Sequence, residues 1–194
     1  ISGATEKMNY YMSAGYLDDK GIVPNSGFQR YSARLKADYQ VKPWLKMEGN
    51  VSFTHYDSRE QDTEGGTSNA NIFYASNIMG AIYPMYVRDA QGNIMVDNRG
   101  FLRYDYGKPG QDSNGSRNTI PNANPLASYM LDKMKYSGDV VSGKWSADID
   151  IWNGIKAKVN IGVDVNNVRA TEMVNPFYGQ YSETSGVGGL ISVA

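Results

Sequence analysis

The stretch YSARLKADYQVKPWLKMEGNVSF, residues Tyr31–Phe53, alternates apolar and polar side chains on both sides of one short interruption. Side chains of a β-strand point alternately to the two faces of a sheet, so each half predicts a strand with one apolar and one charged face. The interruption at residues 42–44 (KPW) predicts a tight turn. Pairing Val41 with Leu45 across this turn keeps both faces consistent, so the stretch predicts a β-hairpin.

Five segments of the chain carry this period-two pattern, which is the sequence signal of a strand with one buried face. Soluble strands are usually ~5–6 residues long, whereas tilted strands that cross a bilayer need ~9–11. The five segments have eleven or twelve residues each and are Lys7–Leu17, Arg30–Val41, Leu45–Tyr56, Val141–Ile151 and Ile155–Asn166.

The last two segments are joined by residues 152–154 (WNG). A two-residue Asn-Gly turn would set an apolar side chain opposite a charged one on the same face. A three-residue turn with Gly154 in the left-handed conformation pairs apolar with apolar residues and sets Asp150 opposite Lys156. We therefore predict the three-residue turn.

The pattern places short turns at one end of the predicted sheet and long loops at the other, which is the asymmetry of outer-membrane barrels. It divides the chain into four parts. Residues 1–58 hold three strands with a tight turn near 42–44, residues 59–138 a long loop region, residues 139–167 a hairpin with its turn at 152–154, and residues 168–194 the start of another loop.

The long loop region carries local signals of its own. Residues 68–83 (SNANIFYASNIMGAIY) predict a short helix with a cap at Ser68 or Asn69 and a stop at Pro84. Residues 85–96 predict a hairpin turning at 89–93, and the Gly-, Asn-, Ser- and Pro-rich residues 107–124 predict a connector. No internal repeat beyond the hairpin unit is predicted.

The composition excludes several classes of protein. A formal net charge of −1 gives no electrostatic argument for binding nucleic acid. The absence of cysteine excludes disulfides and thiolate metal sites, and no apolar run approaches the ~18 residues of a transmembrane helix. The opening ISGATEKMNYY predicts no signal peptide.

The pattern alone leaves open whether the apolar face meets a protein core or lipid. Strand length and loop asymmetry favour a membrane barrel. Tyr31 and Tyr39 bound one apolar stripe and lie ~19 Å apart along the membrane normal at a ~45° tilt, within the ~25 Å apolar band of such barrels. Trp44 and Trp152 hold equivalent places in the short turns, as in an interfacial aromatic belt.

The other face carries charges of both signs, which suits a wet barrel interior better than a packed core. These residues are Arg34, Lys36, Glu48, Lys144, Asp148, Asp150, Lys156 and Lys158.

No set of residues supports catalysis or metal binding. His55 is the only histidine, which argues against a zinc site or a Ser-His-Asp triad, and we interpret it as an interfacial residue. The acidic residues Asp57, Glu60, Asp62 and Glu64 lack the spacing of a calcium loop and are interpreted as a solvated charge run.

Two further motifs have simpler structural interpretations. Asp148 and Asp150 form a carboxylate pair of the kind that cleaves glycosides, but Lys156 and Lys158 across the hairpin predict neutralised ion pairs instead. The GVGG run at 186–189 lacks the strand and helix that phosphate-binding loops require.

The aromatic residues Phe101, Tyr104 and Tyr106 are the strongest binding candidates, since exposed loop aromatics can stack on sugars or anchor a partner protein. Packing of the loop against its neighbours explains them equally well. We therefore predict no catalytic, cofactor-binding or metal-binding residue and no enzymatic activity, and we leave substrate-binding residues unassigned.

The order and spacing of these motifs resemble the SusC/RagA family of TonB-dependent transporters, over essentially the whole chain. YYMSAGYLDDKGIVPNSGFQRYSARLKADYQVKPWLKMEGNVSF (10–53) resembles the family's strand, loop, strand, WLK turn and strand. YPMYVRDAQGNI (83–94) resembles its P-x-Y-x-x-D-x-x-G-N loop. NPLA (124–127) resembles the lead into the next strand, and WSADIDIWNGIKAKVNIGVDV (145–165) the hairpin that follows.

The resemblance implies an all-β transmembrane barrel of about 22 strands with a plugged lumen, in the outer membrane of a Gram-negative bacterium. This chain would form about five consecutive antiparallel strands and a large extracellular loop with a short helix. The resemblance further implies import of oligosaccharides or peptides with a SusD-like surface lipoprotein and energy from a TonB complex. The plug and the TonB-contacting segment are missing from this sequence, so no residue of this sequence can be assigned their roles.

Two other functions stay open at this point. A soluble carbohydrate-binding β-sandwich would bury the apolar face in a core and fold without detergent. A passive porin would share the barrel but lack a plug.

Overall fold

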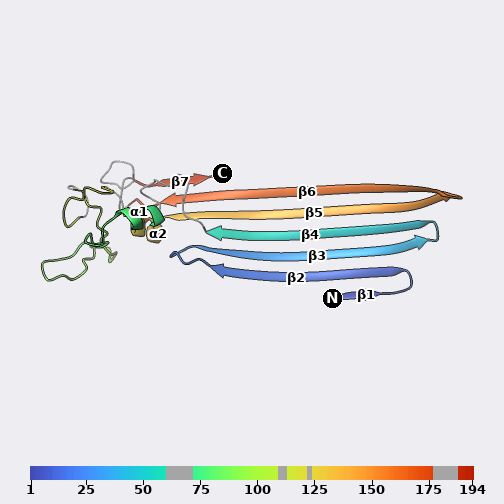
Figure 1. Ribbon diagram of the computed structural model, residues 1–194, viewed down its shortest axis with the longest axis horizontal. Helices are drawn as coiled ribbons and strands as arrows, with labels where there is room; N and C mark the ends of the chain where they lie inside the picture. The colour runs from blue at the N-terminus through green and yellow to red at the C-terminus, as the bar shows by residue number, and fades with distance from the viewer. Residues whose placement is uncertain (60–71, 109–112, 122–123, 177–187) are drawn as a thin grey trace. The chain divides into compact units, whose positions relative to one another are not determined.

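The computed structural model of the chain describes residues 1–59, 72–108, 113–121, 124–176 and 188–194. Its main feature is one antiparallel sheet in which seven strands follow one another in chain order (Figure 1). The strands are β1 (Ser2–Ala4), β2 (Met8–Lys20), β3 (Gly27–Lys42), β4 (Leu45–Arg59), β5 (Lys133–Trp152), β6 (Ile155–Val174) and β7 (Leu190–Val193).

The five predicted strands are confirmed as β2 to β6, and the all-β antiparallel fold class with them. They are longer than predicted, with 13, 16, 15, 20 and 20 residues. The short edge strands β1 and β7 were not predicted, since three or four residues carry little periodicity. Backbone pairing with a neighbour maintains a strand beyond the point where alternation ends, which explains the extra length.

The observed register places apolar residues opposite apolar residues. Met12 of β2 pairs with Leu35 of β3, and the next pair, Ser13 with Arg34, points to the other face. In an antiparallel sheet a shift by one residue would bring apolar and charged side chains onto the same face, so the alternation itself fixes this register.

The turn at 152–154 agrees with the three-residue prediction. Gly154 has a φ of 87°, and the described non-glycine residues with positive φ are Asn25 and Ile120. A type I′ turn needs positive φ at both central residues and is therefore excluded. Nζ of Lys156 lies 3.1 Å from a carboxylate oxygen of Asp150, which is the predicted cross-strand pair.

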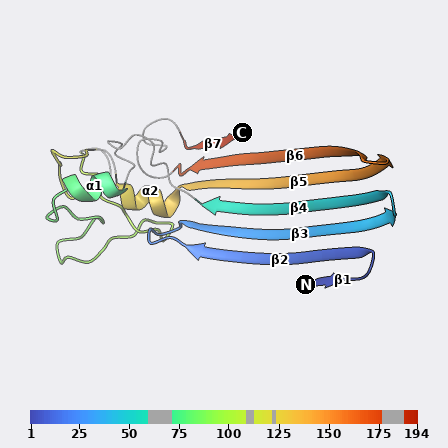
Figure 2. The same ribbon diagram turned by 45° about the vertical axis from the view of Figure 1, so that its right-hand side comes forward.

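Across the turn at 42–44, residues that face each other on β3 and β4 also lie on the same face of the sheet. The rings of Tyr31 and His55 have centroids 6.4 Å apart, and Arg34 Nε donates to Asn50 Oδ1 over 2.9 Å. Both contacts agree with the predicted pairing of Val41 with Leu45. Figure 2 shows this turn and the β5–β6 turn at the same end of the sheet.

Two short helices lie in the chain between β4 and β5. Helix α1 (Ile72–Ile78) confirms part of the helix predicted at 68–83, whose Ser68 or Asn69 cap lies outside the described residues. Helix α2 (Pro125–Leu131) was not predicted, because NPLA was interpreted as the approach to a strand. Oδ1 of Asn124 accepts from Ala127 N over 3.0 Å, and Pro125 suits the first turn, so these residues begin a helix. Within the described residues, neither helix is long and apolar enough to cross a membrane.

Residues 85–105 contain an internal repeat of eight residues, so the prediction of no repeat was wrong. The hairpin predicted at 85–96 is confirmed as one side of a closed, three-sided ring, called the triangular ring below. Its isolated bridges are Tyr86↔Tyr104, Arg88↔Ile94 and Val96↔Leu102. Its central hydrogen bonds run from Val87 N to Arg103 O (2.9 Å), from Arg103 N to Met95 O (3.0 Å) and from Met95 N to Val87 O (2.9 Å).

Two turns of the triangular ring have the same structure. The Asp89 carboxylate accepts from the backbone N–H groups two and four positions on, over 2.9 and 2.8 Å. Asp97 does the same in the second turn, over 2.9 Å in both bonds. Gly92 and Gly100, three positions after each Asp, have φ of 87° and 85°. Such backbone favours glycine, so the repeated Asp-x-x-Gly pattern is a geometric requirement.

The chain separates into two compact units. The sheet unit comprises Ile1–Lys20, Gly27–Ser58 and Tyr136–Arg169. The loop unit comprises Gly21–Ser26, Arg59–Lys135 and Ala170–Ala194, and its core contains Tyr104, Tyr106 and Ala127.

Candidate functional site: the two faces of the sheet

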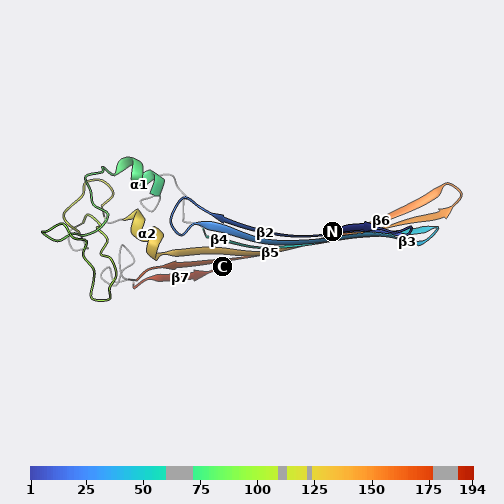
Figure 3. The same ribbon diagram turned by 90° about the horizontal axis from the view of Figure 1, so that it is seen from below.

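The apolar face of the sheet unit is uncovered. Figure 3 views the long strands along the plane of the sheet and shows them as one layer. Within the described residues no second sheet packs against them. Leu35 is 49% exposed, Trp145 45% and Ile161 59%. Soluble monomers rarely leave so many adjacent apolar side chains in water, so this face requires an apolar environment outside the chain.

The apolar stripes have the length of a bilayer core. On β6, apolar side chains alternate from Ile155 to Val165, and the same side then carries Asn167 and Arg169. Ten steps at ~3.3 Å and a ~45° tilt span ~23 Å, close to the ~25 Å apolar band of outer-membrane barrels. The 19 steps between the 20 residues of β6 would span ~44 Å, so part of the strand extends beyond the lipid region.

The loop-side end of the apolar face is marked by a row of contacts across four strands. Tyr16 of β2 and Tyr31 of β3 have ring centroids 4.9 Å apart. Tyr31 also contacts His55 of β4, whose Nδ1 lies 2.8 Å from Oδ1 of Asp139 on β5. Aromatic rings with a polar tip prefer the boundary between lipid and water. The row therefore agrees with the interpretation of His55 as an interfacial residue.

The turn end of the polar face is neutralised by ion pairs. Three lysines there lie next to carboxylates, which balance their charges. The pairs at the turn end are Lys46–Glu48 at 2.9 Å, Lys156–Asp150 at 3.1 Å and Lys158–Asp148 at 3.1 Å, and nearer the middle of the sheet Lys36 lies a longer 3.8 Å from Asp38.

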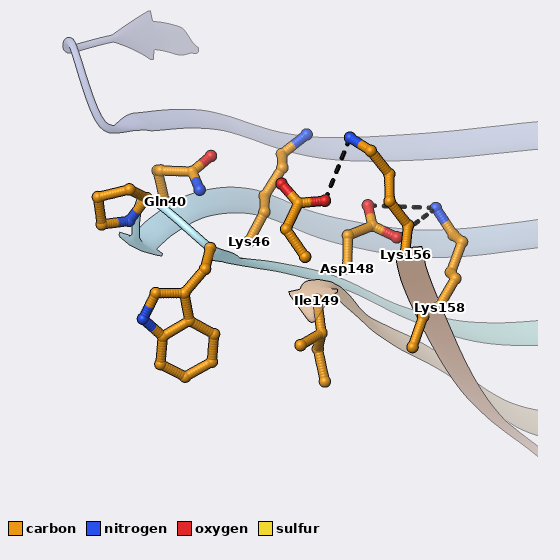
Figure 4. Close-up of a pocket in the computed structure, with 10 residues that line it drawn as sticks. Gln40, Lys46, Asp148, Ile149, Lys156 and Lys158 are labelled. Atoms are coloured by element: carbon orange, nitrogen blue, oxygen red, sulfur yellow. Dashed lines mark hydrogen bonds and ion pairs between the residues drawn. The ribbon is translucent and has the colours of Figure 1, made fainter. Parts of the chain in front are cut away.

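A pocket of about 510 Å³ lies on this polar surface (Figure 4). Lys156 and Lys158 of β6 reach the carboxylates of β5 there, whereas Ile149 points to the other side of its strand. Asp148 and Asp150 are therefore tied to lysines, as predicted. Both carboxylates lie in the same kind of cross-strand ion pair, whereas glycoside cleavage uses two carboxyl groups in different environments.

The described residues form no metal centre. Oδ1 of Asp57 lies 3.9 Å from His55 Nε2, while Glu60, Asp62 and Glu64 lie outside the described residues. In the GVGG run, residues 186 and 187 also lie outside them, and Gly188 follows with a φ of 73°.

The three candidate aromatic residues of the loop differ in their burial. Tyr104 is 4% exposed and Tyr106 3%, and both pack with Ala127 of α2. Burial raises the pKa of the Tyr104 hydroxyl, as expected for a packed phenol. The packing interpretation is therefore correct for these two, while Phe101 is 43% exposed.

Sequence analysis missed the polar residue that organises the loop unit. Asn124 is 1% exposed, and its Nδ2 donates to Met85 O over 2.8 Å and to Asp105 O over 2.9 Å. Asp105 is also buried and accepts from the N–H groups of Gly107 and Asn114, over 2.7 Å each. Asn124 directly before Pro125 is a cap signal that the sequence does contain.

The sequence is similar to parts of known TonB-dependent receptors. No family model matches the chain. It is 30% identical over 79 residues to the TonB-dependent receptor P39 of Formosa agariphila, covering 41% of this chain and 8% of the receptor. It is 34% identical over 59 residues to the TonB-dependent receptor P26 of the same organism, covering 30% and 6%.

The fold matches part of a solved transporter. The RagAB peptide transporter superposes with a TM-score of 0.62 at 23% identity, over 90% of this chain and 18% of that one. The RagAB peptide importer in its closed-closed state gives 0.60 at 23% identity, over 89% and 17%. The chain thus spans less than a fifth of these proteins, and the open seven-stranded sheet corresponds to a segment of a larger barrel wall.

Proposed function

We propose, from the premise that this chain is a barrel segment of a SusC/RagA-like TonB-dependent transporter, that the complete protein imports large nutrients across the outer membrane of a Gram-negative bacterium. The uncovered apolar face of the single sheet is the observation that carries the proposal. In the proposed barrel, Leu35 and Ile161 contact acyl chains, and the charged residues of the opposite face line an aqueous interior.

The energy source and the partner follow from the same premise. The importer draws energy from a TonB complex, works with a SusD-like surface lipoprotein and takes up oligosaccharides or peptides. Its 59–138 region is the extracellular loop beside which the lipoprotein closes. The names of the structural neighbours, which describe peptide import, support a peptide over an oligosaccharide.

The geometry disfavours the soluble sandwich. Such a domain needs a second sheet about 10 Å from the first, and the described residues form one sheet. An open sheet also leaves unpaired backbone groups at both edges, which only further strands of a closed barrel can satisfy inside lipid.

Fractionation and uptake of the full-length protein test the proposal. We expect the protein to remain in outer membranes after a high-salt wash and to dissolve in detergent. Uptake should stop when the TonB complex is removed, whereas a passive porin would continue to conduct. Recovery of the full-length protein in the soluble fraction would contradict the barrel. Uptake that continues without the TonB complex would contradict active import.

A further inference from the structure

The polar face has an unbalanced cationic region in the middle of the sheet unit. Arg34 of β3 and Lys144 of β5 are both exposed, and neither forms an ion pair with a described residue. Both therefore differ from Lys46, Lys156 and Lys158 at the turn end, which lie next to carboxylates. Unpaired cations on a water-lined wall attract anions over several ångströms, because the low-dielectric wall focuses their field.

Arg34 contacts Asn50 of β4, and the strand register places Lys144 opposite the same residue. Arg34 Nε donates to Asn50 Oδ1 over 2.9 Å, so the guanidinium group lies over β4. On the other side, Asp150 N donates to Trp44 O over 2.8 Å, and the His55–Asp139 contact fits the same register. This register sets Lys144 directly opposite Asn50. The two strands that carry the cations are two inter-strand steps apart, or ~10 Å, which long side chains can bridge.

The groups around Asn50 suit a carboxylate. With Oδ1 of Asn50 accepting from Arg34, its amide N–H groups are left to donate. The remaining N–H groups of the guanidinium form a fork that matches two carboxylate oxygens. Ser52 and Ser142 in the neighbouring row add hydroxyl groups, and both side chains are half-buried.

Most of the acidic residues near this region already lie next to a lysine. Glu48 lies next to Asn50 on β4 but receives Lys46 Nζ over 2.9 Å. Asp38 lies 3.8 Å from Lys36. Asp164 on β6 is the remaining carboxylate in these rows of the described sheet, one strand beyond Lys144. The region around Asn50 thus keeps a net positive charge.

We propose that Arg34, Asn50 and Lys144 form a binding site for a carboxylate group of the transported nutrient, such as an acidic peptide side chain or a uronic acid. The inference rests on the proposed function, because it requires the polar face to line the transport path. It assigns the wall of this segment a preference for anionic nutrients, which the balanced ion pairs at the turn end would not provide.

Charged thiol reagents measure the local potential directly. The segment contains no cysteine, so Ser52→Cys gives it a unique reporter two residues from Asn50. In full-length transporter with no other cysteine, we compare its reaction rates with an anionic and a cationic methanethiosulfonate. We expect R34Q/K144Q to lower the anionic-to-cationic rate ratio about tenfold, because two nearby unit charges are removed.

Lys156→Gln is the matched control, since it removes the same charge from a lysine paired with Asp150 at the turn end. We expect it to change the ratio less than about twofold, because its charge lies several residues away along the strands. A ratio that is equal in the parent and in R34Q/K144Q would overturn the proposal.

Protection experiments identify the ligand chemistry. We expect tetraglutamate and trigalacturonate to slow the modification of the cysteine, and tetraglutamine and neutral trigalactose to leave it unchanged. R34Q/K144Q should lose the protection. Equal protection by neutral and acidic probes, or no protection by either acidic probe, would overturn the carboxylate site while leaving TonB-dependent uptake intact. A reporter that reacts only with lipid-soluble reagents would overturn both the site and the proposed function.

Discussion

Nδ1 of His55 on β4 lies 2.8 Å from Oδ1 of Asp139 on β5, at the position where the apolar face of the sheet gives way to polar residues. Both side chains belong to the row that also contains Tyr16 and Tyr31. A boundary of this kind has a measurable depth in a bilayer.

Nitroxide labels should reveal this depth in the full-length protein. On the apolar face, a label at Ile161 should collide mainly with oxygen, which concentrates in lipid, and a label at Asp139 mainly with an aqueous nickel chelate. The reason is that residue 161 lies within the apolar stripe of β6 and residue 139 beyond that of β5. Equal accessibility at both positions would contradict the assignment of the boundary.

Charge should be tolerated on one face of β6 and not on the other. Ile161→Lys places an ammonium group against lipid near the middle of the stripe and should lower the free energy of unfolding from vesicles by about 2–4 kcal/mol. The neighbouring Asn160→Lys points to the polar face and serves as the control, with an expected change within about 0.5 kcal/mol. Urea titration in lipid vesicles measures both, and similar losses in both variants would refute the lipid-facing assignment.

The left-handed backbone of Gly154 should matter for the β5–β6 hairpin. Gly154→Ala should destabilise the barrel by about 1 kcal/mol or more, because a Cβ is strained at a φ of 87°. Gly162 is the matched control. An added Cβ there would lie 3.9 Å from its nearest neighbour, Gly143 O, so Gly162→Ala should be tolerated. Equal unfolding midpoints for the two variants would argue against a conformational role for Gly154.

Removal of the Asn124 side chain should loosen the loop unit. Asn124→Ala removes a helix cap, leaves the buried Asp105 carbonyl without its donor and removes one of the two donors to Met85 O, which costs local stability of about 2–4 kcal/mol. Asn98→Ala is the control, since Ala90 already occupies the equivalent place in the other turn of the triangular ring. Hydrogen exchange of the Arg103 amide should accelerate in the first variant only. Unchanged exchange in Asn124→Ala would mean that the triangular ring does not depend on the Asn124 side chain.

The first turn of the triangular ring should weaken in acid. The Asn93 side chain and backbone N–H groups donate to Asp89 and hold the pKa of its carboxyl below the ordinary value of 3.8. The stabilisation is therefore complete above pH 3.8 and is lost as the pH falls through the lower pKa of the folded turn. Exchange of the Asn93 amide, corrected for its intrinsic pH dependence, should show this loss in the wild type and not in Asp89→Asn. Full protection of this amide in the wild type well below pH 3.8 would disprove the coupling.

The sequence by itself determined the five long strands, the two tight turns and the opposite character of the two faces. These features are local: alternation has a period of two, and a one-residue slip at either turn would place charged residues such as Asp150 on the apolar face. The hydrogen bonds that close the triangular ring, the helix that begins after Asn124 and the burial of Tyr104 were decided only by the tertiary structure. They depend on groups that meet across many residues of chain, and their partners cannot be read from a short window. The cationic region around Asn50 belongs to the same class, because Arg34 and Lys144 come together only when β4 pairs on one side with β3 and on the other with β5.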